Sequence, residues 1–402
     1  MKRNSILLLS IVSFLILTSR IGLTQNFKTE GTKLLDPNGN EFIIRGVNNA
    51  HAWYGEKAEK ILPYFKELKI NTVRVVWETK GNVKSLENVI EECLRNKIIP
   101  MIELHDATGD TSVQRLMELV DYYTDKKTTK VLLPYDNRIL INIANEWGDH
   151  TTTATVWKDA YTEAIRKIRN AGYKAPIVID APGWGQNHEP ILAYGQELIN
   201  SDPLNNIMFS VHMYYSWNDP NKVESELQKL YDANLPMVVG EFGYNFDKGF
   251  NNLKSEVDHI AVMRKCHELK YGYLAWSWSG NNKVNAWLDM AEKRDWETLT
   301  WWGRQVLYSE YGITKNAQMA SIFPNETEEE KAERLKREEK AAKKAEREAK
   351  REKKQAEQEK KRRELLRERS EKLREKAERQ KQKQIERQKK KEKKKAARSK
   401  AE

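Results

Sequence analysis

Short apolar runs alternate along this chain with longer segments in which apolar residues recur every three or four positions. The short runs predict buried strands, whereas the longer period predicts amphipathic helices. Strands are predicted at 42–47, 72–76, 98–104, 139–144, 177–179, 207–211, 237–239 and 272–275. Helices are predicted near 57–68, 85–96, 113–123, 155–170, 190–198, 223–233, 254–269 and 301–308.

Eight strands that alternate with eight helices, within about 290 residues, are typical of an α/β chain that folds as a (β/α)8 TIM barrel. The structural alternative is a doubly wound open sheet, which normally carries a glycine-rich phosphate turn after its first strand. The segment 46–51 offers no such turn. Upstream, the segment 32–42 predicts a β-hairpin that turns at Asn38-Gly39 and caps one end of the barrel.

Residues 1–24 have the pattern of a secretory signal. Met1-Lys2-Arg3 is basic, and the apolar run 6–17 follows it. The run is short for a membrane span, and Gly22-Leu23-Thr24 is a weak cleavage site, so an uncleaved N-terminal anchor is the alternative. We therefore expect a secreted or cell-envelope-associated protein whose barrel domain occupies residues 25–323.

The composition changes abruptly at the third segment, 324–402, which is rich in Lys, Glu, Arg, Ala and Gln. After Pro324 it contains no aromatic, Gly or Pro residue. Such a segment cannot bury a core, yet its residues favour helices, and Glu339–Lys343 has the stabilising i,i+4 spacing. A solvated helix or a disordered tail is predicted. The alternatives are a weak coiled coil and a basic arm that binds an anionic surface or nucleic acid through the Lys-rich end 389–400.

The net charge of +11 belongs to this tail. Residues 325–402 contain 33 Lys and Arg against 20 Asp and Glu, whereas residues 1–324 contain 37 against 39, a net charge of −2. The charge of the globular part therefore argues against nucleic acid as its partner. The only cysteines, Cys93 and Cys266, fall in separate helical patterns and are predicted to be buried apolar side chains rather than a disulfide.

Nearly every predicted strand is followed by polar or aromatic side chains, at the end where an α/β barrel keeps its chemistry. Either Glu146 or Glu241 alone could be a hydrogen-bonded loop residue. Together, at the ends of two strands, they can face each other as the pair of a glycosidase, in which one protonates the leaving oxygen and the other attacks the anomeric carbon or activates a water. The strand ends carry Asn48, His51, Trp53, Arg74, Trp77, His105, Asp106, Asn145, Glu146, Trp147, Asp180, Trp184, His212, Tyr214, Glu241, Trp276 and Trp278.

Tryptophans are concentrated at this rim. A sugar ring has apolar C–H faces and a belt of hydroxyls, so its binding site needs aromatic platforms beside hydrogen-bonding groups. Seven of the twelve tryptophans fall at or just after strand ends, namely Trp53, Trp77, Trp147, Trp184, Trp217, Trp276 and Trp278. Some of these are expected to pack the barrel rim instead.

A metallohydrolase is the alternative enzyme class. His51, His105, Asp106, His212 and Glu241 could be written as ligands. Barrel metal sites usually place two histidines on one strand as His-x-His, and this chain has no such pair. No metal and no cofactor are therefore expected.

Four of these strand ends resemble glycoside hydrolase family 5: Asn145-Glu146, His212-Met213-Tyr214, Gly240-Glu241-Phe242-Gly243 and Leu274-Ala275-Trp276-Ser277-Trp278. Further motifs are similar to the bacterial β-1,4-mannanases of its subfamily 8. These are His51-Ala52-Trp53-Tyr54, His105-Asp106-Ala107-Thr108-Gly109, Ile141-Asn142-Ile143-Ala144-Asn145-Glu146-Trp147 and Gly183-Trp184-Gly185-Gln186. The resemblance covers roughly residues 30 to 322.

The resemblance implies a retaining endo-glycosidase acting on β-1,4-linked mannan-type polysaccharides, with Glu146 as acid/base and Glu241 as nucleophile. Retention requires carboxyl groups about 5 Å apart, with Glu241 ionised and the pKa of Glu146 raised. By the same resemblance, Arg74 keeps Glu241 charged and Tyr214 hydrogen-bonds it. The remaining implied roles are contact with the 2-hydroxyl for Asn145, positioning for His105 and His212, a subsite floor for Trp276, and substrate binding for Trp53, Trp184 and Trp278.

The sequence departs from the family pattern at Asn49, where a His is expected, and in the loops 76–80 and 214–221. These loops would line outer subsites, so an endo-β-1,4-glucanase on the same scaffold remains an alternative. A second alternative is a non-catalytic, surface-tethered carbohydrate-binding or scaffold protein.

Overall fold

The computed structural model describes residues 25–244 and 257–324, together with the single positions 332 and 336. The chain divides into two units, Met1–Pro324 and Asn325–Glu402, and the fold below belongs to the first. The predicted signal segment and, apart from those two positions, the predicted tail lie outside the described residues.

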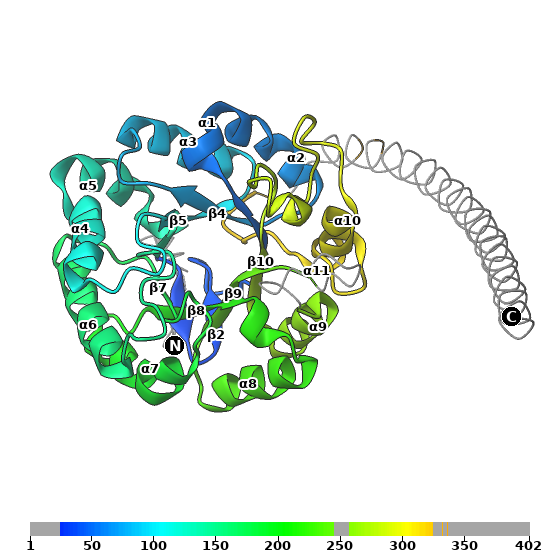
Figure 1. Ribbon diagram of the computed structural model, residues 1–402. Helices are drawn as coiled ribbons and strands as arrows, with labels where there is room; N and C mark the ends of the chain where they lie inside the picture. The colour runs from blue at the N-terminus through cyan, green and yellow to red at the C-terminus, as the bar shows by residue number, and fades with distance from the viewer. Residues whose placement is uncertain (1–24, 245–256, 325–331, 333–335, 337–402) are drawn as a thin grey trace, which may run out of the picture. The chain divides into compact units, whose positions relative to one another are not determined.

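Eight parallel strands close into a barrel in the order β10-β3-β4-β5-β6-β7-β8-β9, which confirms the predicted (β/α)8 fold (Figure 1). Each predicted apolar run overlaps one of these strands. Their bounds are β3 (Arg45–Asn49), β4 (Thr72–Trp77), β5 (Ile99–Leu104), β6 (Leu140–Asn142), β7 (Ile177–Asp180), β8 (Ile207–Met213), β9 (Met237–Phe242) and β10 (Gly272–Ala275).

Helices surround the barrel (Figure 1). Side chains that cap the first turn begin several of them, such as Asn82, Ser112 and Thr153. The helices are α1 (His51–Lys60), α2 (Leu62–Glu67), α3 (Val83–Arg95), α4 (Val113–Thr124), α5 (Lys126–Leu132), η1 (Leu133–Arg138), α6 (Ala154–Asn170), α7 (Glu189–Ser201), η2 (Tyr215–Trp217), α8 (Pro220–Asp232), α9 (His259–Leu269), η3 (Ala286–Leu288), α10 (Trp301–Tyr308) and α11 (Ile313–Asn316).

Two helical predictions need correction. The helix predicted near 57–68 is two helices, because Pro63 lies in the first turn of α2, where its missing N–H costs least. The polar segment between α4 and β6 was not predicted to be regular, yet it forms α5 and η1. Asp125 begins α5 by accepting a hydrogen bond from the backbone N–H of Lys127.

The predicted hairpin is present, but its paired strands lie upstream of the predicted turn. Strands β1 (Lys28–Glu30) and β2 (Lys33–Leu35) pair around Gly31, whose φ of +59° suits glycine. The expected turn at Asn38-Gly39 does form, with the Gly39 N–H donating to the Asp36 carbonyl oxygen at 2.8 Å. The residues on either side of this turn form only an isolated β-bridge, between Leu35 and Glu41, and no paired strands.

The hairpin closes the N-terminal end of the barrel, as predicted. Its side chains Phe27, Leu34 and Phe42 join an apolar cluster inside the cylinder. The barrel contributes Ile44, Ile99, Met101, Leu140, Val178, Met208, Val238 and Leu274 to this cluster, which we call the floor cluster. A larger core fills the space between the strands and the helices. Cys93 and Cys266 are buried and unpaired, as expected.

In the described part of the chain, no helix has both the length and the apolar character needed to cross a bilayer.

Replacing Leu140 by Ala should lower the free energy of unfolding by about 2–5 kcal/mol, because the side chain is fully buried in the floor cluster and its loss leaves a cavity. Chemical denaturation measures this change. Leu204→Ala is the matched control, since Leu204 is 46% exposed and should change stability by less than about 0.5 kcal/mol. Equal losses in the two variants would contradict the assigned packing.

Candidate active site

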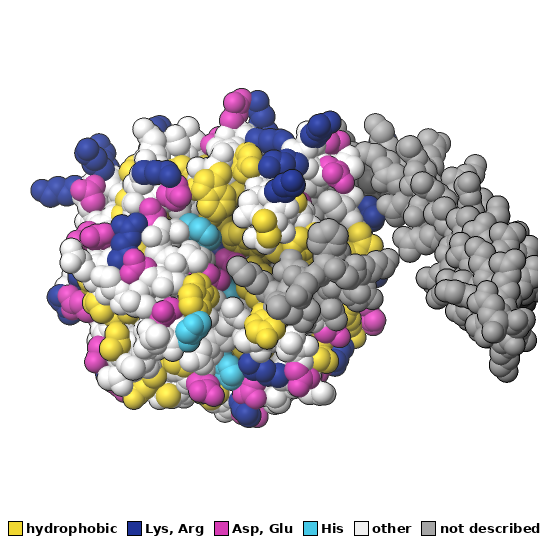
Figure 2. Space-filling view, viewed as in Figure 1, with side chains coloured by type: hydrophobic (Ala, Val, Ile, Leu, Met, Phe, Trp, Pro, Cys, Tyr) yellow, Lys and Arg dark blue, Asp and Glu magenta, His cyan; other side chains and the backbone are white. Residues whose placement is uncertain are grey.

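Two glutamates converge at the carboxyl ends of the strands. Glu146 follows β6 and Glu241 lies in β9. One carboxylate oxygen of each, together with a ring nitrogen of His212, lies within 4.8 Å of the others. The face in Figure 2 carries hydrophobic side chains and histidines gathered near its centre. The two carboxylates are therefore close enough to act on one atom of a bound molecule.

Glu146 is held by its own backbone as well as by its side chain. Its φ is +46°, a left-handed conformation that costs a residue other than glycine about 1–3 kcal/mol. Its N–H donates to Oδ2 of Asp180 at 3.1 Å, and its carbonyl oxygen accepts the N–H of Gly109 at 2.9 Å. These two hydrogen bonds hold the backbone of Glu146 in that conformation.

Arg74, on β4, is a fully buried cation beneath the glutamates. Its Nη1 donates to Glu241 Oε1 at 2.8 Å, and its Nη2 donates to Asp180 Oδ2 at 3.3 Å. Nη1 also lies 3.5 Å from Glu103 Oε2. Burial lowers the pKa of Arg74, but together these three carboxylates raise it by more than burial lowers it. The net shift of the Arg74 pKa is therefore upward. We call these four residues the buried charge cluster.

Three asparagine side chains complete the shell around Arg74. Nη1 donates to Asn48 Oδ1 at 3.0 Å, and Nε donates to Asn142 Oδ1 at 2.8 Å. Nη2 donates to Asn145 Oδ1 at 2.8 Å. All three nitrogens of the Arg74 guanidinium are therefore held by hydrogen bonds. The amide nitrogen of Asn145 donates to Thr108 Oγ1 at 2.7 Å, and its second N–H can donate to a ligand in the cleft.

Both oxygens of Glu241 accept hydrogen bonds. Arg74 donates to Oε1, and the Tyr214 hydroxyl donates to Oε2 at 2.8 Å. Burial and the charge of Glu241 raise the pKa of Tyr214, so the hydroxyl keeps its proton and remains a donor. Donors on both oxygens stabilise the charged form of a carboxylate, which is the form that a nucleophile needs.

Glu146 has the opposite electrostatic environment. Burial raises its pKa first, and the charges of Glu241 and Asp180 raise it further, well above the ordinary value. His212 lies beside it, with Nδ1 2.8 Å from Glu146 Oε1. Burial lowers the pKa of His212 to about 3, so the ring is neutral. This environment favours the protonated form of Glu146, which is the form that a general acid requires.

Aromatic side chains line the cleft on one side of the glutamates. Trp276 stacks on His105 with ring centres 5.7 Å apart, and Trp53 meets the same ring edge-on at 5.4 Å. His105 is held from below by Glu103, 3.2 Å from its Nδ1. Burial lowers the pKa of His105, but Glu103 outweighs this effect and raises it. These rings border a cavity of about 440 Å³.

The cleft continues on the other side of the pair. Trp184, after β7, lies 4.4 Å from the His150 ring, and both line a cavity of about 740 Å³ with Gln186 and Tyr215. Hollows on both sides of the glutamates match a ligand that runs across the barrel rather than one that ends at its centre.

Trp278 does not belong to this site, which corrects the sequence prediction. Its side chain is completely buried, packs on Phe65 with ring centres 4.5 Å apart, and donates from Nε1 to the Trp296 carbonyl oxygen. Two residues that are two positions apart point to the same side only within a strand. Because β10 ends at Ala275, Trp276 and Trp278 both lie beyond it and need not point to the same side. Trp147 and Trp217 are also fully buried and pack the rim.

Asn49, the departure from the family pattern, is also buried. Its Nδ2 donates to the Ala58 carbonyl oxygen at 3.0 Å, so its amide helps to join β3 to α1.

No role was predicted for Glu103, Asn142 or Asp180. All three are completely buried around Arg74. Asn142 stands between Ile141 and Ile143, and such a polar residue inside an apolar strand is the signal that could have identified it.

Glu146, His212 and Glu241 are also the described residues whose spacing would suit a metal ion. The neighbouring groups do not suit one. Arg74 already donates to Glu241 Oε1 and Tyr214 to Oε2, so a divalent cation would face a buried guanidinium and two hydrogen-bond donors. The set fits proton transfer and nucleophilic attack better than metal binding.

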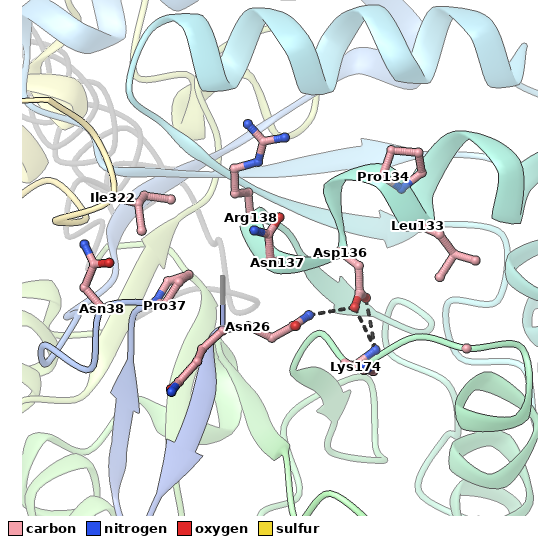
Figure 3. A pocket seen from close by; sticks show the side chains of 12 residues that line it. Asn26, Pro37, Asn38, Leu133, Pro134, Asp136, Asn137, Arg138, Lys174 and Ile322 are labelled. Carbon is pink, nitrogen blue, oxygen red and sulfur yellow. Dashed lines mark hydrogen bonds between the residues drawn. The ribbon is translucent and has the colours of Figure 1, made fainter. Parts of the chain in front are cut away.

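A further cavity of about 1030 Å³ lies at the opposite end of the barrel, near the starts of β6 and β7 (Figure 3). Its buried carboxylate, Asp136, accepts hydrogen bonds from Asn26 Nδ2 at 2.6 Å and from the backbone N–H groups of Lys174 and Ala175. This carboxylate fixes loops together and is not part of the site.

The sequence model of the family described as "Cellulase (glycosyl hydrolase family 5)" matches residues 35–282. The chain is 36% identical over 307 residues to a mannan endo-1,4-beta-mannosidase of Salipaludibacillus agaradhaerens, covering 75% of this chain and 96% of the relative. It is 34% identical to a "Beta-mannanase/endoglucanase A" of Caldicellulosiruptor saccharolyticus, over 64% of this chain and 20% of that protein. The solved mannohexaose complex of a Thermomonospora fusca beta-mannanase is similar, with TM-score 0.68, 34% identity, and coverage of 75% of this chain and 100% of that one.

Replacing Glu241 by Gln should lower the pKa of Glu146, because a neutral amide removes a charge that raises it. The pKa should stay above the ordinary value, since burial and Asp180 remain. Titration of ¹³C-labelled glutamate by NMR measures the shift. Tyr214→Phe is the control, since it removes a hydrogen bond to Glu241 but not the charge. An unchanged pKa in Glu241→Gln would disprove the assigned coupling.

Proposed function

The chain belongs to glycosyl hydrolase family 5, and from that premise we propose that it is a retaining endo-β-1,4-mannanase, which cuts internal linkages of mannan-type polysaccharides. The observation that carries this proposal is that one carboxylate oxygen of Glu146 lies within 4.8 Å of one of Glu241. Retaining enzymes place them about 5–5.5 Å apart, whereas inverting enzymes need about 6.5–9.5 Å to admit a water.

The first step forms a covalent intermediate. The Glu241 carboxylate attacks the anomeric carbon while the bond to the leaving sugar breaks. Glu146 gives its proton to the departing oxygen and becomes a carboxylate. Within the described residues, the hydrogen bond from His212 ends on Glu146 Oε1, which leaves Oε2 to face the leaving group.

The second step releases the product. Glu146, now charged, takes a proton from a water molecule, and the water oxygen attacks the anomeric carbon. The bond to Glu241 breaks, and Glu241 regains its charge beside Arg74 and Tyr214. Each step inverts the anomeric carbon, so the product keeps the configuration of the substrate.

The cleft supports a polymeric substrate that is cut internally. Because Glu146 protonates the leaving oxygen, the leaving sugar lies towards the Trp184 side, and the sugar that reacts with Glu241 lies towards Trp276. Hollows of about 440 and 740 Å³ extend in these two directions. Mannan as the substrate follows from the names of the relatives and from the mannohexaose bound to the T. fusca enzyme.

An endo-β-1,4-glucanase is the second candidate, and the double name of the C. saccharolyticus relative favours it. The non-catalytic alternative is disfavoured, because a scaffold protein has no need for two adjacent buried carboxyl groups with such different hydrogen-bond partners.

We also propose that residues 1–24 direct the enzyme to the cell envelope or out of the cell. The basic start and the apolar run that follows support this, as does a polymeric substrate that cannot cross a membrane. For the tail, we propose a solvated helical or disordered extension whose Lys-rich end, 389–400, meets an anionic surface.

Glu146→Gln should lower hydrolysis of mannan by about 10²–10⁴-fold, the usual contribution of a general acid. Glu241→Gln should lose more, because no nucleophile remains. Reducing-sugar release from mannan, glucomannan and carboxymethyl cellulose measures both variants and the substrate preference. Glu163→Gln is the matched control, since the Glu163 side chain on α6 is 45% exposed and pairs with Arg166. ¹H NMR of the first product should show the β-anomer, and an initial α-anomer would exclude the mechanism.

Two deletions test the location. Without residues 1–24, mannanase activity in a bacterial host should move from the envelope and medium to the cytoplasm. Without residues 325–402, activity should leave the envelope at lower salt than the full chain does, because exposed charge pairs are screened by salt. An unchanged distribution of either variant between the cell fractions would contradict the corresponding proposal.

A further inference from the structure

Asp180, the last residue of β7, is a buried carboxylate with no part in the two chemical steps. Its Oδ2 accepts the backbone N–H of Glu146 at 3.1 Å and the Arg74 Nη2–H at 3.3 Å. The same oxygen lies 3.4 Å from His212 Nε2. Its Oδ1 accepts Asn142 Nδ2 at 3.0 Å. One side chain thus touches the acid/base residue, the histidine beside it and the central cation.

Asp180 cannot reach a bound sugar. It is completely buried, whereas Glu146 keeps 11% of its side chain exposed to the cleft. Any effect of Asp180 on catalysis must therefore pass through the residues that it contacts.

The contact with Glu146 has a specific consequence. The left-handed backbone of Glu146 breaks the strand pattern, so its N–H finds its acceptor in a side chain rather than in a neighbouring strand. An amide in place of the Asp180 carboxylate would weaken this hydrogen bond and release the backbone from its strained conformation. The reach and direction of the Glu146 carboxyl depend on that conformation.

We propose that Asp180 is a positioning residue for the general acid: it fixes the backbone of Glu146 so that the Glu146 proton points at the leaving oxygen. This role rests on the proposed glycosidase function. It predicts that Asp180 matters when the leaving group needs a proton and matters little when it does not.

The electrostatics of the cluster support the same role. Glu146 faces His212 from β8, Glu241 from β9, Arg74 from β4, Glu103 from β5 and Asp180 from β7. The charge of Asp180 raises the pKa of Glu146, after burial and Glu241. Removing it should move the alkaline limb of the pH profile to lower pH.

Glu103 provides a matched control. It is equally buried and also lies beside the Arg74 guanidinium, with Oε2 3.5 Å from Nη1. Its other partner is His105, on the opposite side of the cleft, and not the backbone of Glu146. Asp180→Asn and Glu103→Gln each remove one carboxylate from the same cation, but only the first releases the acid/base residue.

The experiment compares mannan with a 2,4-dinitrophenyl β-mannoside, whose leaving group departs without protonation. Asp180→Asn should lose about 10²-fold in kcat/KM on mannan, the size of loss that a misplaced catalytic group causes. It should stay within a few-fold of wild type in the first turnover of the aryl mannoside, and its alkaline limb should shift down. Glu103→Gln should lose similar factors on both substrates, and its alkaline limb should shift less than that of Asp180→Asn, because the charge of Glu103 raises the pKa of Glu146 less than the charge of Asp180 does.

Equal losses on both substrates with an unshifted pH profile in Asp180→Asn would overturn the positioning role. If that variant does not fold, as judged by circular dichroism, Asp180→Glu carries the test. It keeps the charge but moves the oxygen, so it should show the loss on mannan while the alkaline limb stays in place. A wild-type chain that cleaves neither substrate would instead disprove the proposed function, and this role with it.

Discussion

The active site depends on one buried cation that is outnumbered by carboxyl groups. Arg74 is surrounded by Glu103, Asp180 and Glu241, with Glu146 next to them. Carboxylates in a water-poor interior cannot all remain charged beside a single positive group. The group with the least support, Glu146, keeps its proton, while Glu241 receives both Arg74 and Tyr214 as donors. The division of labour between two identical side chains thus follows from their partners.

Removing the cation would leave several buried charges without a counter-charge, and such losses are costly for stability. The barrel accommodates the cluster because its upper interior is lined by asparagines rather than aliphatic side chains. Asn48, Asn142 and Asn145 each give Arg74 an oxygen without adding charge. Folding and chemistry therefore share the same hydrogen bonds at this level of the cylinder.

The sequence predicted the barrel and the residues at its rim, because apolar runs mark strands and the barrel collects its strand ends on one face. It could not identify Asp180 or Glu103 as partners of Arg74, since their contacts join strands that are distant along the chain. Trp278 was misplaced because a period-two pattern stops where β10 stops. The hairpin strands were misplaced, although the turn at Gly39 forms, because the chain also turns at Gly31 and the paired strands flank that turn.

The floor cluster and the buried charge cluster divide the inside of one cylinder into a dry half, closed by the N-terminal hairpin, and a polar half that opens to the cleft. Because the two halves share strands but few side chains, they can diverge at different rates. Substitutions in the lower half would change the thermal stability of the fold. Substitutions at the rim would change which polysaccharide binds in the cleft. Enzymes with this arrangement can therefore change their substrate preference while the floor cluster that stabilises the fold stays the same.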